Sequence, residues 1–249
     1  MNFPQGIRAI LFDLDGTLRY NRPRFNDILS KFAIEYGADD TLDNRHSAER
    51  WLHYYWAQSA DVLLDIETYG EMSPAFWENH TRRYLLAFGF APDRAGRLAP
   101  EIYRRMSAEY DPQPWIPPEV FEVLRKLRAA GFLLGIVSNR TNPLHEELQD
   151  FGLDSYIDLI LTAGEANSWK PDIGIFLEAV MRLQVSPGEV LYVGDNYFAD
   201  VIGARNAGLR PVLLDPEGVF HDAECEVIHK LHDLIGLCQQ GPVNIKKNS

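Results

Sequence analysis

The chain has 249 residues, of which 46% are hydrophobic and 24% are charged, and its formal net charge is −12. This balance is typical of a soluble globular protein of one or two domains, and the acidic charge argues against a nucleic acid or an anionic membrane as a partner. Two cysteines outside any CxxC pair, and the lack of a signal-like or membrane-length apolar run, lead us to expect a cytoplasmic protein without a membrane partner.

The first predicted element is a buried strand at residues 9–12, whose apolar run ends in Asp13-Leu14-Asp15-Gly16-Thr17. A single residue separates Asp13 from Asp15, so their side chains point the same way on extended backbone. In open parallel α/β sheets, ligand sites form beyond the carboxyl ends of the strands. A bound cation would relieve the repulsion between the two carboxylates. Taken by itself, the segment also fits an ordinary Asp-Gly turn.

Residues 19–111 show helical spacing and no convincing buried strand. We expect four helices there, at about 25–36, 43–56, 73–89 and 92–110, the third with Ser73 as N-cap and Pro74 in its first turn. The proline-rich residues 111–118 predict a hinge or linker. The expected domains are therefore a discontinuous one of residues 1–18 and 112–249 and an inserted helical one of residues 19–111.

From residue 118 onward, strands alternate with helices, which predicts right-handed crossovers and a parallel sheet covered on both faces. The expected strands lie at 132–137, 157–161, 190–193 and 212–214, with a short edge strand at 226–228. A single helix is expected at 198–207, between two of these strands. The predicted fold class is thus α/β, a doubly wound parallel sheet with an all-helical insertion.

Three of these strands end in polar residues, and their ends share one edge of the predicted sheet. With two further residues near helix starts, the polar set is Asp13, Asp15, Ser138, Asn139, Lys170, Asp195 and Asp200. The aspartates offer hard oxygen ligands that suit Mg²⁺. Lys170 and Ser138 supply a charge and a donor for an anion. A metal beside an anion site predicts phosphoryl transfer, with one carboxylate as nucleophile and another handling the leaving-group proton.

Four segments of the chain, in order, resemble the four motifs of the haloacid dehalogenase (HAD) superfamily. They are Asp13-Leu14-Asp15-Gly16-Thr17, Val137-Ser138-Asn139, Lys170-Pro171 and Gly194-Asp195-Asn196-Tyr197-Phe198-Ala199-Asp200. Each motif alone is weak, whereas the ordered set is highly specific. The resemblance covers residues 7–18 and 118–237, implies the Rossmann-like HAD core, and makes the insert similar to the helical cap of type I members.

The resemblance implies a role for each matched residue. Asp13 would be the nucleophile that forms an aspartyl-phosphate, and Asp15 the general acid and then the base. The phosphate-binding residues would be Thr17, which also orients the segment of Asp15, and Ser138, Asn139 and Lys170. The Mg²⁺ ligands would be Asp13, Asp15 through its main-chain carbonyl, Asp195 and Asp200. Asp200 has an alternative role, in which it supports the site through water or Lys170.

Asp15 separates the activities of the family, because the true dehalogenases lack this second aspartate. Its presence favours a Mg²⁺-dependent phosphomonoester hydrolase that acts on a small phosphorylated metabolite, as a monomer or homodimer. The alternatives are a non-catalytic binding or regulatory protein and, among enzymes, a phosphomutase or dehalogenase. Sugar phosphates, phosphoglycolate and nucleotides all stay open as substrates.

Two arginines near the motifs are ambiguous. Arg140 follows Ser138-Asn139, where many relatives carry glycine. It either lines the phosphate site or faces solvent, and we favour solvent because most arginines are exposed. Arg19 begins a basic stretch after the first motif. That stretch is either a solvated loop or a contact with an anionic or polar leaving group, and the sequence leaves both open.

Overall fold

The computed structural model describes residues 6–238, which divide into two compact units. The first combines the segment up to Tyr20 with the chain from Ile116 onward, and the second comprises Asn21–Trp115. The first unit holds every residue that the sequence motifs single out. Among the described residues, no helix is long and apolar enough to cross a membrane.

A six-stranded sheet forms the centre of the first unit, in the order β5-β4-β1-β6-β7-β8 with every pairing parallel. Its strands are β1 (Ala9–Phe12), β4 (Leu133–Ser138), β5 (Leu159–Thr162), β6 (Val190–Gly194), β7 (Arg210–Leu214) and β8 (Glu226–Ile228). Phe12, at the end of β1, lies beside Ile136 and Val193. This register brings the carboxyl ends of the three central strands together.

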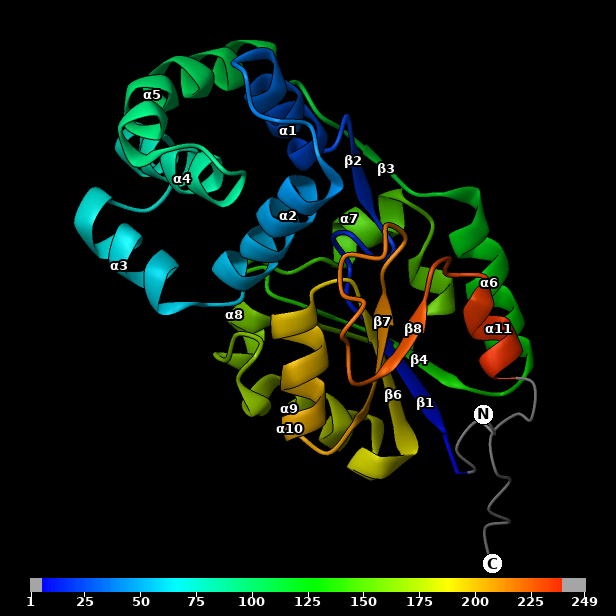
Figure 1. Cartoon of the computed structure of the whole chain (residues 1–249). Coiled ribbons are helices and arrows are strands. Elements are labelled where there is room, and N and C mark those ends of the chain that lie inside the picture. Colours follow the sequence, from blue (N-terminus) through cyan, green and yellow to red (C-terminus); the bar gives the residue numbers. More distant parts are fainter. Residues whose placement is uncertain (1–5, 239–249) are drawn as a thin grey trace, which may run out of the picture. The chain divides into compact units, whose positions relative to one another are not determined.

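Helices cover both faces of this sheet (Figure 1). On one face, Ile10 and Phe12 pack against α6 (Pro118–Ala129), α7 (His145–Asp150) and α11 (Asp233–Leu237). On the other, Ala9 and Leu11 pack against α9 (Ile173–Leu183) and α10 (Gly203–Asn206). All four residues of β1 are fully buried, as expected for a strand of a covered parallel sheet. The predicted α/β fold class is confirmed.

The chain after β6 differs from the single helix expected at 198–207. Residues Tyr197–Ile202 form a π-helix, and the short α10 follows it. The side chain of Asn196 caps the π-helix by accepting hydrogen bonds from the N–H groups of Phe198 and Ala199. Such wide turns are rare and occur often at functional sites, and this one carries Asp200.

The second unit contains five helices rather than the four expected: α1 (Phe25–Glu35), α2 (Leu42–Trp56), α3 (Ala60–Tyr69), α4 (Pro74–Ala87) and α5 (Pro92–Glu109). Ser73 caps α4 as predicted. The unexpected α3 lacks a clear apolar stripe, since Leu63 and Leu64 are half exposed. The short strands β2 (Tyr20–Arg22) and β3 (Gln113–Trp115) pair with each other, and both were missed because they are too short for an alternating pattern.

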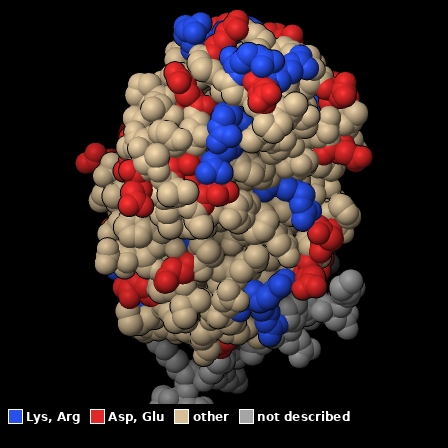
Figure 2. All heavy atoms as spheres, turned by 60° about the vertical axis from the view of Figure 1, so that its left-hand side comes forward, with Lys and Arg blue, Asp and Glu red and all other residues tan. Residues whose placement is uncertain are grey.

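The surface carries a mixture of charges. On the face drawn in Figure 2, basic side chains lie among acidic ones, with no continuous basic stripe over the described residues of that face. This distribution agrees with a sequence in which 36 acidic residues outnumber 24 Lys and Arg.

Candidate active site

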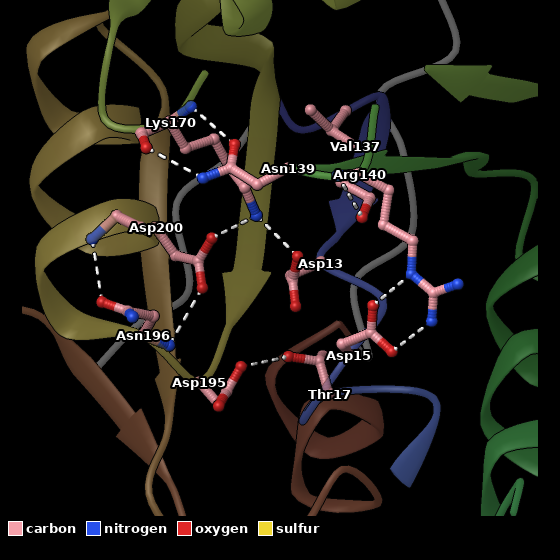
Figure 3. Close-up of polar contacts among 12 residues, drawn as sticks. Asp13, Asp15, Thr17, Val137, Asn139, Arg140, Lys170, Asp195, Asn196 and Asp200 are labelled. Carbon is pink, nitrogen blue, oxygen red and sulfur yellow. Dashed lines mark hydrogen bonds and ion pairs between the residues drawn. The ribbon is translucent and has the colours of Figure 1, made fainter. Parts of the chain in front are cut away.

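The carboxyl ends of β1, β4 and β6 bring the predicted polar residues together (Figure 3). Asp13 directly continues β1, and its N–H donates to the carbonyl of Val193 on β6. The loop after β1, the end of β4, the residue after β6, the turn before α9 and the π-helix supply the polar residues. They are Asp13, Asp15, Thr17, Ser138, Asn139, Lys170, Asp195 and Asp200. Central position in the sheet lets segments far apart in sequence meet at one point.

Lys170 lies at the centre of this cluster and is almost fully buried. Its Nζ is 2.6 Å from Oδ1 of Asp13, 2.7 Å from Oδ1 of Asp200 and 2.9 Å from the hydroxyl of Tyr192. These contacts use all three N–H groups of the ammonium. The backbone of Lys170 is held as well, because its N–H and C=O form reciprocal hydrogen bonds with the side-chain amide of Asn139.

The two phosphate-binding candidates at the end of β4, Ser138 and Asn139, both have protein partners. The Asn139 amide is engaged with the Lys170 backbone at 2.7 and 2.9 Å. The Oγ of the buried Ser138 accepts a 3.3 Å hydrogen bond from the N–H of Arg140. The first of these contacts fixes the lysine, and the second fixes the turn after β4. The predicted contacts of Ser138 and Asn139 with a phosphoryl group remain predictions.

Burial dominates the electrostatics of the nucleophile candidate. It raises the pKa of Asp13 well above the usual range, the nearby Asp200 and Asp195 carboxylates add to the rise, and Lys170 opposes it. For Lys170, burial alone would lower the pKa, but the carboxylates of Asp13 and Asp200 outweigh it and hold the pKa well above its ordinary value. The lysine therefore stays charged, and two carboxylates share one buried ammonium while the Asp195 carboxylate lies near Asp13.

This excess of negative charge fits a divalent cation. Asp13, Asp195 and Asp200 each offer a carboxylate oxygen, and these oxygens lie within 4.8 Å of one another. All are hard donors of the kind Mg²⁺ prefers. Thr17 donates a 3.2 Å hydrogen bond to Oδ1 of Asp195. Oδ2 of Asp200 accepts from the N–H of Asn196, so the protein holds both oxygens of that carboxylate.

Gly16 is required by this geometry. Its φ of +94° lies in the left-handed region, and a Cβ at this position would overlap the carboxylate of Asp195. The glycine after Asp15 therefore does more than permit a turn. The absence of a side chain lets the loop after β1 lie against the Asp195 carboxylate.

Arg140 does not simply face solvent, so the favoured expectation was wrong, and its side chain turns toward the site residue Asp15. Its guanidinium binds Asp15 through two hydrogen bonds, Nε to Oδ2 at 2.7 Å and Nη2 to Oδ1 at 2.8 Å, and its Nη1 donates to Glu147 at 2.7 Å. The Arg140 side chain is one-third exposed. A planar guanidinium matches a carboxylate in this two-bond arrangement, and Asp15 raises the pKa of Arg140 accordingly. Arg19 also donates to Asp15, at 3.0 Å.

Tyr192 is a site residue that sequence reasoning missed. It lies in the middle of β6, is fully buried, donates to the carbonyl of Val137 at 3.0 Å, and accepts from Lys170. Burial raises its pKa well above the ordinary value, so the phenol stays protonated. The available signal was a hydroxyl within an otherwise apolar strand next to Gly194-Asp195.

Tyr192→Phe should therefore lower both activity and stability while the other contacts of Lys170 remain. We expect kcat to fall about 10-fold with KM little changed, and the free energy of unfolding to fall by about 1–2 kcal/mol, because one N–H of Lys170 and the carbonyl of Val137 lose a partner. Steady-state kinetics and urea unfolding measure the two effects. Tyr156→Phe, on the partly buried Tyr156 outside the site, is the matched control. An unchanged kcat in Tyr192→Phe would limit this tyrosine to a structural role.

The chain is similar to known proteins in both sequence and fold. The family model described as haloacid dehalogenase-like hydrolase matches residues 7–208. The chain is 31% identical to a ribulose-1,5-bisphosphate 5-phosphatase of Halopiger xanaduensis, over 84% of each chain. It is 30% identical to a phosphoserine phosphatase of Thermus thermophilus, over 84% of this chain and 89% of the relative. A HAD phosphatase structure from Thermococcus onnurineus has the same fold, with a TM-score of 0.56 at 24% identity and coverage of 95% and 99%.

Proposed function

The chain belongs to the haloacid dehalogenase-like hydrolases, and on that premise we propose that it is a Mg²⁺-dependent phosphomonoester hydrolase acting through an aspartyl-phosphate on Asp13. The family and the phosphatase relatives support hydrolysis of a small phosphorylated metabolite. The single observation that carries the finer proposal is the buried cluster of Asp13, Lys170 and Asp200, with Asp15 two residues beyond the nucleophile.

In the first step, a carboxylate oxygen of Asp13 attacks the phosphorus atom, and the bond from phosphorus to the leaving oxygen breaks. Asp15 gives its proton to that oxygen. In the second step, Asp15 takes a proton from water, which attacks the aspartyl-phosphate and releases inorganic phosphate and free Asp13. Lys170 offsets the negative charge beside Asp13 throughout.

Asp13, Asp195 and Asp200 would hold Mg²⁺. When bound, this ion supplies charge neutralisation for the phosphoryl oxygens and favours the ionised form of the carboxylates around it. A cation held there would oppose the effect of burial, which raises the pKa of the Asp13 carboxyl group. Lys170 already acts on the same carboxylate, through its Nζ at 2.6 Å.

Removal of Mg²⁺ should stop the reaction. We expect phosphate release from a panel of phosphorylated metabolites to disappear with excess EDTA and to return when Mg²⁺ is added beyond the chelator. The physical reason is that three clustered carboxylates without the cation repel an incoming phosphate dianion. A colorimetric phosphate assay measures the rate. Hydrolysis that continues in EDTA would contradict the proposed metal requirement.

A non-catalytic binding protein is the second candidate function. It would bind a phosphorylated metabolite without releasing phosphate, and the intact set of Asp13, Asp15 and Lys170 argues against it. The same panel separates the two, because binding without turnover by the Mg²⁺-loaded protein would favour this alternative.

A further inference from the structure

Four charged side chains form a ring next to the metal-ligand candidates. Arg140 and Arg19 both contact Asp15, and Glu147 lies 2.7 Å from Nη1 of Arg140 and 3.8 Å from Nε of Arg19. The four residues come from the loop after β1, the loop after β4 and α7, all within the first unit. Two positive and two negative charges leave this charged ring neutral.

The charged ring has donors that the protein does not use. Among the described residues, the Nε of Arg19 is buried and has no hydrogen-bond partner, since Glu147 at 3.8 Å is beyond hydrogen-bond distance. Arg140 uses three of the five N–H groups that a guanidinium carries, two on Asp15 and one on Glu147. Buried polar groups of folded proteins almost always have partners, so the Nε of Arg19 is a donor that an acceptor on a ligand can use.

The position of Asp15 places these donors beside the leaving group. In the proposed function, on which this inference rests, Asp15 comes within hydrogen-bond reach of the leaving oxygen. Arg19 and Arg140 contact Asp15 at 2.7–3.0 Å and therefore lie next to whatever the leaving oxygen is attached to. When the Asp15 carboxyl group turns toward that oxygen, the two arginines retain only Glu147 as an anionic partner. One further anion would restore the balance of charge.

We propose that Arg19 and Arg140 bind a second anionic group on the leaving part of the substrate. The preferred substrates are then phosphomonoesters whose leaving group carries a carboxylate or another phosphate. Guanidinium groups bind both anions through pairs of parallel hydrogen bonds, so the shared chemistry is an oxyanion near the scissile ester. Neutral sugars and simple alcohols would leave the Nε of Arg19 without an acceptor.

Two matched substrate pairs test this inference with the Mg²⁺-loaded protein. One compares 3-phosphoglycerate with glycerol 3-phosphate, which differ by a carboxylate. The other compares fructose 1,6-bisphosphate with fructose 6-phosphate, which differ by a phosphate. In at least one pair we expect kcat/KM to favour the substrate that carries the additional carboxylate or phosphate by about 10-fold or more, the size of one charge-assisted interaction. The pair that shows this preference identifies the anion.

Substitutions then locate the preference. Arg140→Ala and Arg19→Ala should each reduce the ratio of kcat/KM within that pair at least about 5-fold, because the ratio cancels any general loss of activity. Arg182→Ala, which removes an exposed arginine paired with Glu178 on α9, should leave the ratio as it is. A preference that survives in both site variants overturns the inference.

The wild-type protein alone also decides the matter. Ratios near one in both pairs, from a protein that hydrolyses p-nitrophenyl phosphate with Mg²⁺, would overturn the anion site and leave the phosphatase function standing. No hydrolysis of p-nitrophenyl phosphate or of any phosphorylated metabolite would overturn the proposed function, and the anion site with it. The two failures are therefore distinguishable.

Discussion

Replacement of Asp13 by asparagine is expected to lower kcat by at least about 10⁴-fold, because the amide cannot attack phosphorus and form the aspartyl-phosphate. Asn is nearly isosteric with Asp and can still accept a hydrogen bond from Lys170, which is 2.6 Å from the native carboxylate. The fold and the position of Lys170 should therefore persist in the variant. The measurement is phosphate release under saturating substrate and Mg²⁺, together with the thermal unfolding midpoint of the variant.

The control for this experiment is Asp150→Asn, which makes the same chemical change at an exposed position on α7. It should retain wild-type kcat. Residual turnover in Asp13→Asn within about 10-fold of wild type would exclude covalent catalysis by this residue. If Asp13→Asn loses activity because it unfolds, Asp13→Glu separates the two effects. It keeps the charge beside Lys170 but displaces the carboxylate oxygens, so it should remain folded and inactive.

Replacement of Lys170 by methionine should have the largest effect on stability. The ammonium lies between two buried carboxylates, so its removal leaves the charges of Asp13 and Asp200 uncompensated. We expect the free energy of unfolding to fall by about 3 kcal/mol without Mg²⁺, and activity to be lost. Added Mg²⁺ should recover part of the stability, because a cation on the same carboxylates replaces part of the missing charge.

The pH for this measurement follows from the pKa shift. The folded-state pKa of Lys170 lies above its ordinary value of 10.5, so its stabilising contribution is fully present below that pH and is lost as the pH rises through the folded-state pKa. At pH 7 the whole contribution is measured. The pKa of Asp13 is also raised, so protonation at acidic pH removes one of the uncompensated charges, and the deficit of Lys170→Met should shrink there.

Urea unfolding at pH 7 and in mild acid measures both effects. The matched control is Lys126→Met, which removes a lysine whose Nζ is 2.6 Å from Glu122 on the exposed surface of α6. That ion pair is solvated, so its loss should change stability little. Equal losses in the two variants would contradict the view that the buried charges of Asp13 and Asp200 depend on Lys170.

Local sequence pattern determined the α/β fold class and the place of the candidate site. The apolar run at 9–12 predicted a strand covered on both faces, and its abrupt end in Asp13-Leu14-Asp15 indicated the edge where a ligand would bind. Alternation of strands and helices after residue 118 then implied that other strand ends would share that edge. Both inferences rest on short-range periodicity, which a single sequence displays directly.

Contacts between distant segments were decided only by the tertiary structure. Arg140 and Asp15 are 125 residues apart, and nothing in the local pattern of either segment shows that the guanidinium turns toward that carboxylate. The same holds for Tyr192. The sequence predicts only that it belongs to an apolar strand, whereas the structure places its hydroxyl 2.9 Å from Nζ of Lys170. The order of the motifs thus predicts which strand ends lie together. The direction of each side chain depends on the packing and charge around it, which exist only after the sheet has formed.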